Sequence, residues 1–161
     1  MSLNPYAILL DGRDAVTVAS QTPARLAALV QQLGEEGVER SSGPGKWTVR
    51  QILGHLADTE IAFSFRLRQT LAEPLHMIQP FDQDLWAQAN DSFSVAEALE
   101  TFTVLRKWNL ALLRGVPADA FFRQVTHPER GTMTFGTIVE TMGGHDLNHL
   151  QQIEQIAGQA A

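Results

Sequence analysis

The sequence predicts an all-α protein, most simply a four-helix bundle with short connecting helices. Three observations predict this fold class. Four long stretches repeat their apolar residues at helical spacing, two of these stretches begin with a capping box, and strand signals are few. No internal repeat or linker divides the 161 residues. We therefore expect a single domain over residues 1–161, which is an ordinary size for one hydrophobic core.

The N-terminal third of the chain carries signals for a short helix and a long one. Asn4 followed by Pro5 indicates a first helical piece, which Gly12 interrupts. Thr22 before Pro23 is typical of an N-cap with proline at the first helical position. Apolar residues then repeat at helical spacing up to residue 34, a glycine. We therefore expect the first long helix over residues 22–34.

The second long helix has the strongest start signal. Residues 48–51 form a capping box, which places the first helical residue at Val49. We expect the helix to continue to about Glu73, because Pro74 pushes the residue before it out of the helical region. Beyond it, residues 83–89 after Asp82 predict a short connecting helix.

A second capping box at residues 94–97 predicts the third long helix, which ends at Gly115. Residues 122–135 are rich in β-branched side chains and contain a turn at residues 127–131, so they predict a small extended ribbon. Thr134 then opens the last helix, which ends near Gly158. These elements complete the predicted bundle.

Composition and charge exclude several classes of protein. With 44% apolar and 19% charged residues the chain is globular, and without cysteine it holds neither disulfides nor thiolate metal sites. Its net charge of −6 and its scattered basic residues argue against a nucleic-acid partner. Its longest early apolar run, residues 7–10, is too short for a signal sequence or a membrane span. We expect a soluble, cytoplasmic protein without a membrane partner.

Two histidines in the last helix are the first candidate metal ligands. His145 and His149 stand at positions i and i+4, which places their Cβ atoms about 6 Å apart on one helix face. Both imidazoles can therefore reach one ion at roughly 2.1 Å. They belong to an apolar stripe that should face the interior: Ile138, Met142, His145, His149, Ile153 and Ile156. The alternative is a pair of hydrogen-bonded core histidines.

A catalytic metal site typically uses three protein ligands. His55 is the best third candidate, because it lies on an inward stripe of the capped second helix. The remaining histidines, His76 and His127, lie beside prolines in connecting segments, and we interpret both as exposed polar residues.

These residues carry a resemblance to a known family. Residues 44–48 (PGKWT), 55–60 (HLADTE) and 145–149 (HDLNH) with a following Gln-Ile pair at 152–153 are similar to motifs of the DinB-like, or YfiT-like, metalloenzymes. The likeness extends roughly from residue 22 to residue 158. It implies a four-helix bundle in which His55, His145 and His149 hold a divalent metal, usually zinc or nickel. It also implies that the protein forms a homodimer.

Two acids near these histidines are candidate catalytic residues. Asp146 stands one residue past the first histidine, where H-E-x-x-H helices carry a general-base glutamate, although its side chain is shorter. Its alternative is an ordinary, partly exposed acid. Asp58 follows His55 by three residues, and its carboxylate can accept a hydrogen bond from the N–H of an imidazole that binds the metal. Its alternative is a surface acid paired with an arginine.

An ion on three neutral imidazoles keeps its positive charge and an open position. It can lower the pKa of a bound water or present a thiolate as nucleophile. The resemblance implies both uses, metal-dependent hydrolysis and transfer of a low-molecular-weight thiol such as bacillithiol or mycothiol to an electrophile. We favour thiol transfer, because a thiolate needs no general base. Without cysteine in the chain, the thiol must be a small-molecule substrate. A non-catalytic metal-binding stress protein is the third hypothesis.

Overall fold

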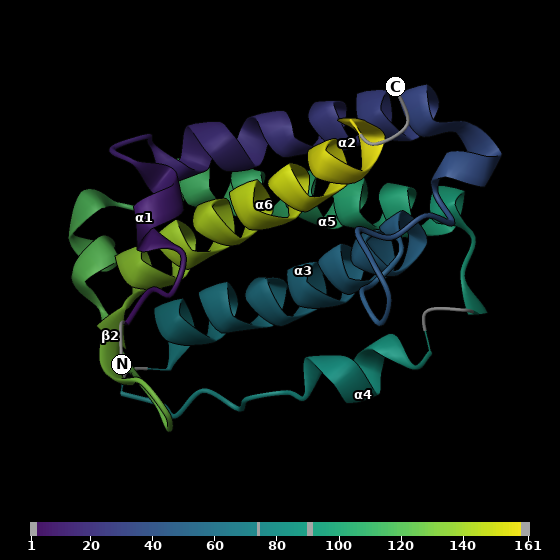
Figure 1. Ribbon diagram of the computed structural model, residues 1–161. Coiled ribbons are helices and arrows are strands. Elements are labelled where there is room, and N and C mark those ends of the chain that lie inside the picture. The colour runs from purple at the N-terminus through teal and green to yellow at the C-terminus, as the bar shows by residue number, and fades with distance from the viewer. Residues whose placement is uncertain (1–2, 74, 90–91, 159–161) are drawn as a thin grey trace.

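The computed structural model describes residues 3–73, 75–89 and 92–158. Four long helices form the body of the molecule (Figure 1): α2 (Ala15–Gly37), α3 (Val49–Ala72), α5 (Val95–Gly115) and α6 (Phe135–Gly158). The main contacts join α2 with α6, α6 with α3, α3 with α5, and α5 with α2. The predicted all-α four-helix bundle is therefore confirmed. No helix in the described residues is long and apolar enough to cross a lipid bilayer.

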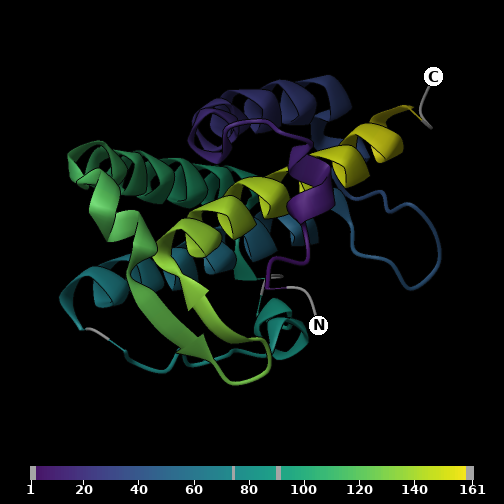
Figure 2. The same cartoon turned by 90° about the vertical axis from the view of Figure 1, so that its left-hand side faces the viewer.

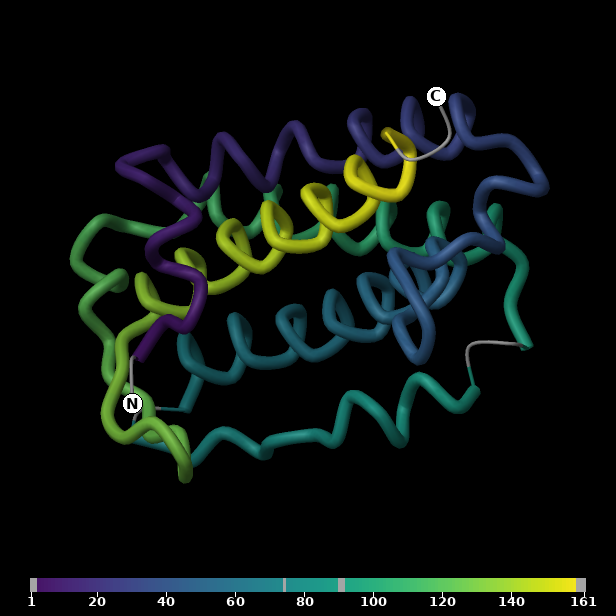
Figure 3. Tube along the Cα trace, in the orientation of Figure 1, coloured from purple at the N-terminus to yellow at the C-terminus, as the bar shows by residue number. Residues whose placement is uncertain are grey.

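The order of the helices in the bundle differs from their order in the chain. Each long helix packs mainly against two others, and the connections from α2 to α3 and from α5 to α6 join helices across the diagonal of the bundle. The tube in Figure 3 shows the segment between α3 and α5 running back along the outside of α3. This arrangement places α6 beside α3, which brings the candidate histidines of both helices to one interface.

The start of α2 differs from the prediction. The helix begins after Asp14, whose carboxylate accepts a hydrogen bond from the Thr17 amide at 2.7 Å. Thr22 is therefore no N-cap but a buried residue within the helix, and the prediction was wrong. Pro23 removes the amide that would donate to the Ala19 carbonyl, and a guanidinium nitrogen of Arg106 donates to that carbonyl instead, at 3.0 Å. This distant donor lets the helix continue through its proline.

The other end of α2 explains the predicted stop. Gly34 has a φ of 65°, which kinks the helix at the predicted end, and helical residues continue to Gly37. The predicted short helix, α1 (Ala7–Leu10), precedes α2 and ends before Gly12, but its N-cap is Tyr6, two residues after Asn4.

The capped helices begin where the sequence predicts. In α3 the Thr48 hydroxyl and the Gln51 side chain form the reciprocal capping box, and in α5 Ser94 and Glu97 do the same. Pro74, predicted to end α3, lies outside the described residues. Between α3 and α5, the short helix α4 (Gln83–Ala87) is capped by the Asp82 carboxylate and ends two residues before the predicted end.

The predicted ribbon is also confirmed. A 3-10 helix, η2 (Ala118–Phe122), leads into strands β1 (Gln124–His127) and β2 (Gly131–Thr134), which pair antiparallel (Figure 2). Val125 and Met133 face each other across the ribbon and are buried in the core. His127 is only 6% exposed, so the expected exposed residue is in fact part of the interior. The ribbon buries it because every second residue of β1 faces inward.

Two glycines let the N-terminal segment approach α6. A Cβ on Gly144 would lie 2.7 Å from the Tyr6 Cβ, and a Cβ on Gly143 would lie 2.9 Å from the Ala15 carbonyl oxygen. Only glycine permits such close backbone approach. Because Gly144 directly precedes His145, this packing places Tyr6 over the candidate metal ligands.

Candidate metal centre

The structure brings the three predicted histidines together. His55 comes from α3, and His145 and His149 come from successive turns of α6. The Nε2 atom of His145 lies 3.0 Å from that of His55 and 3.1 Å from that of His149. Among the described residues they form a group whose ligand atoms all lie within 4.8 Å of one another, and all three side chains are buried. Below they are called the three-His cluster.

The proton positions in this cluster fit a metal site. The Nδ1 atom of His149 lies 2.9 Å from the Gln152 side-chain oxygen and donates a hydrogen bond to it. The Nε2 atom of the neutral ring therefore directs a lone pair inward. A single N–H on His145 Nε2 can be directed at only one of the two neighbouring rings, and the Thr59 hydroxyl lies 3.4 Å from the Nε2 atom of His55. Nitrogens that share one ion at about 2.1 Å lie roughly 3.4 Å apart. The observed separations are close to that value.

Burial keeps the three imidazoles neutral. It lowers the pKa of His55 to about 3, and the charge that His149 can carry adds to this effect. Burial also lowers the pKa of His145 well below its ordinary value, with further contributions from the other two rings and from Arg106. The pKa of His149 is lowered by burial as well. Neutral imidazole is the form that donates a lone pair to a metal.

Aromatic side chains surround the cluster. The Trp47 ring lies 4.8 Å from that of His55, measured between ring centroids. Tyr6 and Phe63 present their edges to His145 at 5.4 Å and 6.2 Å. These rings lower the local polarity, which strengthens every electrostatic interaction at the cluster.

Two cavities border different members of the cluster, and Tyr6 and Gln83 line both. The Trp47 cavity, of about 450 Å³, contains Trp47 and His149 in its wall. The smaller one, of about 160 Å³, has His55, His145, Arg66 and Arg130 in its wall and is called the Arg66 cavity below. Each of the three imidazoles thus lines one of the two cavities.

Asp146, the predicted general base, is engaged elsewhere. It is buried, not partly exposed, and both of its carboxylate oxygens accept hydrogen bonds from Arg106. The Thr22 hydroxyl donates to the same carboxylate at 2.8 Å. The Asp146 carboxylate is thus engaged in an ion pair inside the bundle. A catalytic role for Asp146 stays a prediction, but the geometry gives its carboxylate a structural partner.

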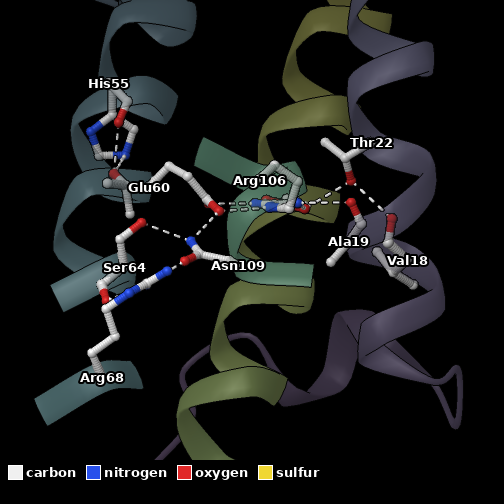
Figure 4. A network of polar contacts seen from close by, with 11 residues as sticks. Val18, Ala19, Thr22, His55, Glu60, Ser64, Arg68, Arg106 and Asn109 are labelled. Atoms are coloured by element: carbon white, nitrogen blue, oxygen red, sulfur yellow. Dashed lines mark hydrogen bonds and ion pairs between the residues drawn. The ribbon is translucent and has the colours of Figure 1, made fainter. Parts of the chain in front are cut away.

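Arg106 is the centre of a buried polar network that the sequence reasoning missed (Figure 4). Its guanidinium donates to both oxygens of Glu60, at 2.9 Å and 2.7 Å, as well as to Asp146. Asn109 also donates to Glu60 and accepts a hydrogen bond from Arg68. Burial opposes the charge of Arg106, but the two carboxylates outweigh it and raise the guanidinium pKa. These residues are called the Arg106 network below.

A signal for this network was present in the sequence. Arg106 and Asn109 stand between Phe102 and Leu113 on the inward stripe of the third long helix. Polar residues in an apolar stripe need partners when they are buried. The stripe alone does not say which residues those partners are.

Asp58 is half-buried on α3, and burial raises the pKa of its carboxyl group. Its predicted action on an imidazole stays a prediction. The two other histidines stay apart from the three-His cluster. His76 is half-buried, with its Nδ1 atom 2.9 Å from the Glu73 carbonyl, and His127 lines the Arg66 cavity.

Comparison with known proteins places this site in a family. The family model described as the DinB superfamily matches residues 19–153, which include all three histidines. The chain belongs to the DinB superfamily. This confirms the resemblance that the sequence motifs carry.

Two curated proteins are similar to this chain over most of its length. A protein of Oceanobacillus iheyensis is 30% identical over 83% of this chain and 78% of its own length. YfiT of Bacillus subtilis is 28% identical over 88% of this chain and 82% of its own length. Both carry the name "putative metal-dependent hydrolase". The solved structure of YfiT is described as a four-helix bundle of unusual topology. It aligns with a TM-score of 0.84 over 91% of this chain and 85% of that chain, at 24% identity. The two proteins therefore have the same fold.

Proposed function

We propose that this DinB-superfamily protein is a divalent-metal-dependent enzyme that transfers a low-molecular-weight thiol to an electrophilic substrate at the three-His cluster. One observation carries the choice of reaction. In the part of the chain that the structure describes, no carboxylate joins the imidazoles of the cluster, and the acid next to His145 is bound by Arg106. Hydrolysis profits from a well-placed general base, whereas thiol transfer does not need one.

The residues of the cluster have separable tasks in this proposal. A divalent ion, zinc or nickel, supplies a Lewis acid that lowers the pKa of a bound thiol. His55, His145 and His149 hold the ion, and Gln152 fixes the tautomer of His149. The surrounding aromatic rings exclude water. The two cavities can receive the thiol and the electrophile separately, and the thiol is a substrate because the chain has no cysteine.

Hydrolysis is the second candidate function, and the names of the relatives favour it. A non-catalytic metal-binding role is less well supported, since cavities reach the imidazoles and a purely structural site is closed by protein ligands.

A discriminating experiment uses the protein loaded with zinc or nickel. It is incubated with a halo-aromatic electrophile and a panel of small thiols, and in parallel with ester and amide substrates. We expect thiol consumption that disappears in the His145→Ala variant. Ester or amide hydrolysis without thiol, dependent on the same histidines and without thiol consumption, would favour the hydrolase instead.

We also propose that the protein acts as a homodimer. Large apolar side chains are exposed on the outer parts of α3 and α5, among them Ile61, Phe65, Val104 and Trp108. Exposed apolar groups on neighbouring helices favour a protein contact. Light scattering should give twice the chain mass for the wild type, and the Phe65→Glu/Trp108→Glu variant should be monomeric. A monomeric wild type would contradict the proposal.

A further inference from the structure

Two arginines share a cavity with the three-His cluster. Arg66 follows His55, Thr59 and Phe63 along the face of α3 that lines the Arg66 cavity. Arg130 enters the same cavity from the turn between β1 and β2. An arginine of the bundle and an arginine of the ribbon, 64 positions apart in the chain, thus line the same cavity as His55 and His145.

Neither guanidinium is paired with an acid in the part of the chain that the structure describes. Within the described residues, Arg25, Arg50 and Arg106 form ion pairs with acids, whereas Arg66 and Arg130 form none. The Arg66 side chain donates one hydrogen bond, to the Gln79 carbonyl at 3.3 Å, and lies 5.7 Å from the centre of the Phe81 ring. Most of its donors remain for a ligand.

The surroundings of Arg66 favour the binding of an anion. Arg66 is half-buried, and burial together with the charge of Arg130 lowers its pKa. Burial and both arginines also lower the pKa of His127, while Glu129 raises it, and the Nδ1 atom of this ring accepts a hydrogen bond from the Glu129 amide at 3.2 Å. Glu129 is the only acid among the residues that line this cavity, and its side chain is exposed and forms no ion pair with either arginine in the described structure. Two positive charges in one partly enclosed space attract an anion.

Building on the proposed function, we propose that Arg66 and Arg130 form a subsite for the anionic group of a substrate, a carboxylate or a phosphate. Guanidinium groups bind the oxygens of both anions through paired hydrogen bonds. With about 160 Å³ the Arg66 cavity holds one small group and not a whole substrate. The substrate class is therefore an anionic electrophile or an anionic thiol, held by its charged end so that its reactive atom lies at the three-His cluster.

The test measures anion binding separately from activity. Calorimetric titrations of the full-length protein as purified, with its metal content determined, use benzoate, inorganic phosphate and the neutral benzamide as probes. We expect benzoate or phosphate, but not benzamide, to bind. The Arg66→Gln and Arg130→Gln variants should each weaken that binding about tenfold or more, because each removes a charge-assisted hydrogen bond. Binding of benzoate alone identifies a carboxylate subsite, and binding of phosphate alone identifies a phosphate subsite.

Matched variants make the result specific. Arg25→Gln removes an exposed, paired arginine and should leave anion binding unchanged. Arg66→Lys keeps the charge and should restore part of the affinity. In His145→Ala the probe should still bind, which shows that it is not simply a ligand of the metal. Wild-type-like binding in both arginine-to-glutamine variants, or no anion binding to the wild type, would overturn the subsite. Neither result affects the proposed reaction, which thiol consumption with an uncharged electrophile tests independently.

Discussion

Two buried polar clusters meet on α6, and they differ in how their charges are balanced. His145 belongs to the three-His cluster, while its neighbour Asp146 belongs to the Arg106 network on a different face of the helix. In the Arg106 network a guanidinium is held by two carboxylates, and amide and hydroxyl groups supply further hydrogen bonds. In the three-His cluster the nitrogens of three imidazoles that burial keeps neutral face one another.

This difference separates a structural cluster from a functional one. Buried charges are stable when they are paired, and the Arg106 network is complete without any ligand. Three converging imidazole nitrogens are the donor set that binds a divalent cation. One residue step along a helix therefore changes the role of a polar side chain, because each successive side chain faces a different neighbour.

The largest effect on stability is expected from a substitution that breaks the Arg106 network. The Arg106→Met variant leaves Glu60 and Asp146 buried without their cation, which should lower the free energy of unfolding by about 3–5 kcal/mol. Urea denaturation measures this loss. The Arg25→Met variant, which breaks a pair with exposed Glu154, should lose no more than about 1 kcal/mol.

A second variant keeps this prediction testable if Arg106→Met fails to fold. Adding Glu60→Gln and Asp146→Asn removes the unpaired charges and should recover part of the stability. A loss below about 1 kcal/mol for Arg106→Met alone would show that the network contributes little.

Neighbouring substitutions on α6 should have opposite signatures. His145→Ala should abolish the binding of about one divalent ion per chain, and with it the stabilisation of about 2.7 kcal/mol expected at an ion concentration 100 times the dissociation constant. Asp146→Asn should keep the metal and lower the stability of the metal-free protein. Elemental analysis and thermal unfolding with and without added zinc measure both. Full occupancy in His145→Ala would contradict the metal site, and full occupancy in His55→Ala would remove His55 from it.

Acid should destabilise the metal-free protein through the three-His cluster. Because burial lowers the pKa of His55 to about 3 and also lowers those of His145 and His149, the unfolded chain binds protons that the folded chain does not as pH falls below about 6.5. Stability should be full above that pH. It should then decline by about 1.4 kcal/mol per pH unit for each imidazole, until the folded pKa is reached.

Denaturation curves between pH 7 and pH 4 measure this slope. The His55→Gln variant has one imidazole fewer, so the slope of its stability against pH should be smaller by about 1.4 kcal/mol per pH unit. An unchanged slope in this variant would show that His55 titrates normally. Metal affinity should weaken below about pH 6 as well, because protonated imidazole has no lone pair to donate.

The smallest effect concerns the support of the cluster. Gln152→Leu removes the acceptor of the His149 Nδ1–H hydrogen bond and should weaken metal affinity by about tenfold without abolishing binding. Competition with a coloured chelator measures the change. Gln151→Leu, at the exposed neighbouring position, serves as the control and should bind like the wild type. Equal affinities in both variants would show that the tautomer of His149 is set by other contacts.

Local signals determined the helices and part of the site. The capping boxes at Thr48 and Ser94 placed the starts of α3 and α5, because a cap depends on groups within four residues of one another. The spacing of His145 and His149 determined that both rings face the same way, since the helix period is local as well. The ribbon before α6 followed from its turn and its β-branched residues.

Tertiary structure alone decided the features that depend on distant partners. α2 continues through Pro23 because Arg106, 87 residues away from Ala19, donates to the carbonyl that the proline leaves open. Asp146 became an ion-pair partner because the packing of α2, α5 and α6 places Thr22 and Arg106 around it. The inward stripe of the second helix indicated that His55 is buried. It could not show that the Nε2 atom of His55 lies 3.0 Å from the Nε2 atom of His145, 90 residues further on. A sequence pattern records which side of an element is buried, but only the folded chain sets what each buried polar group meets there, and that partner decides its chemistry.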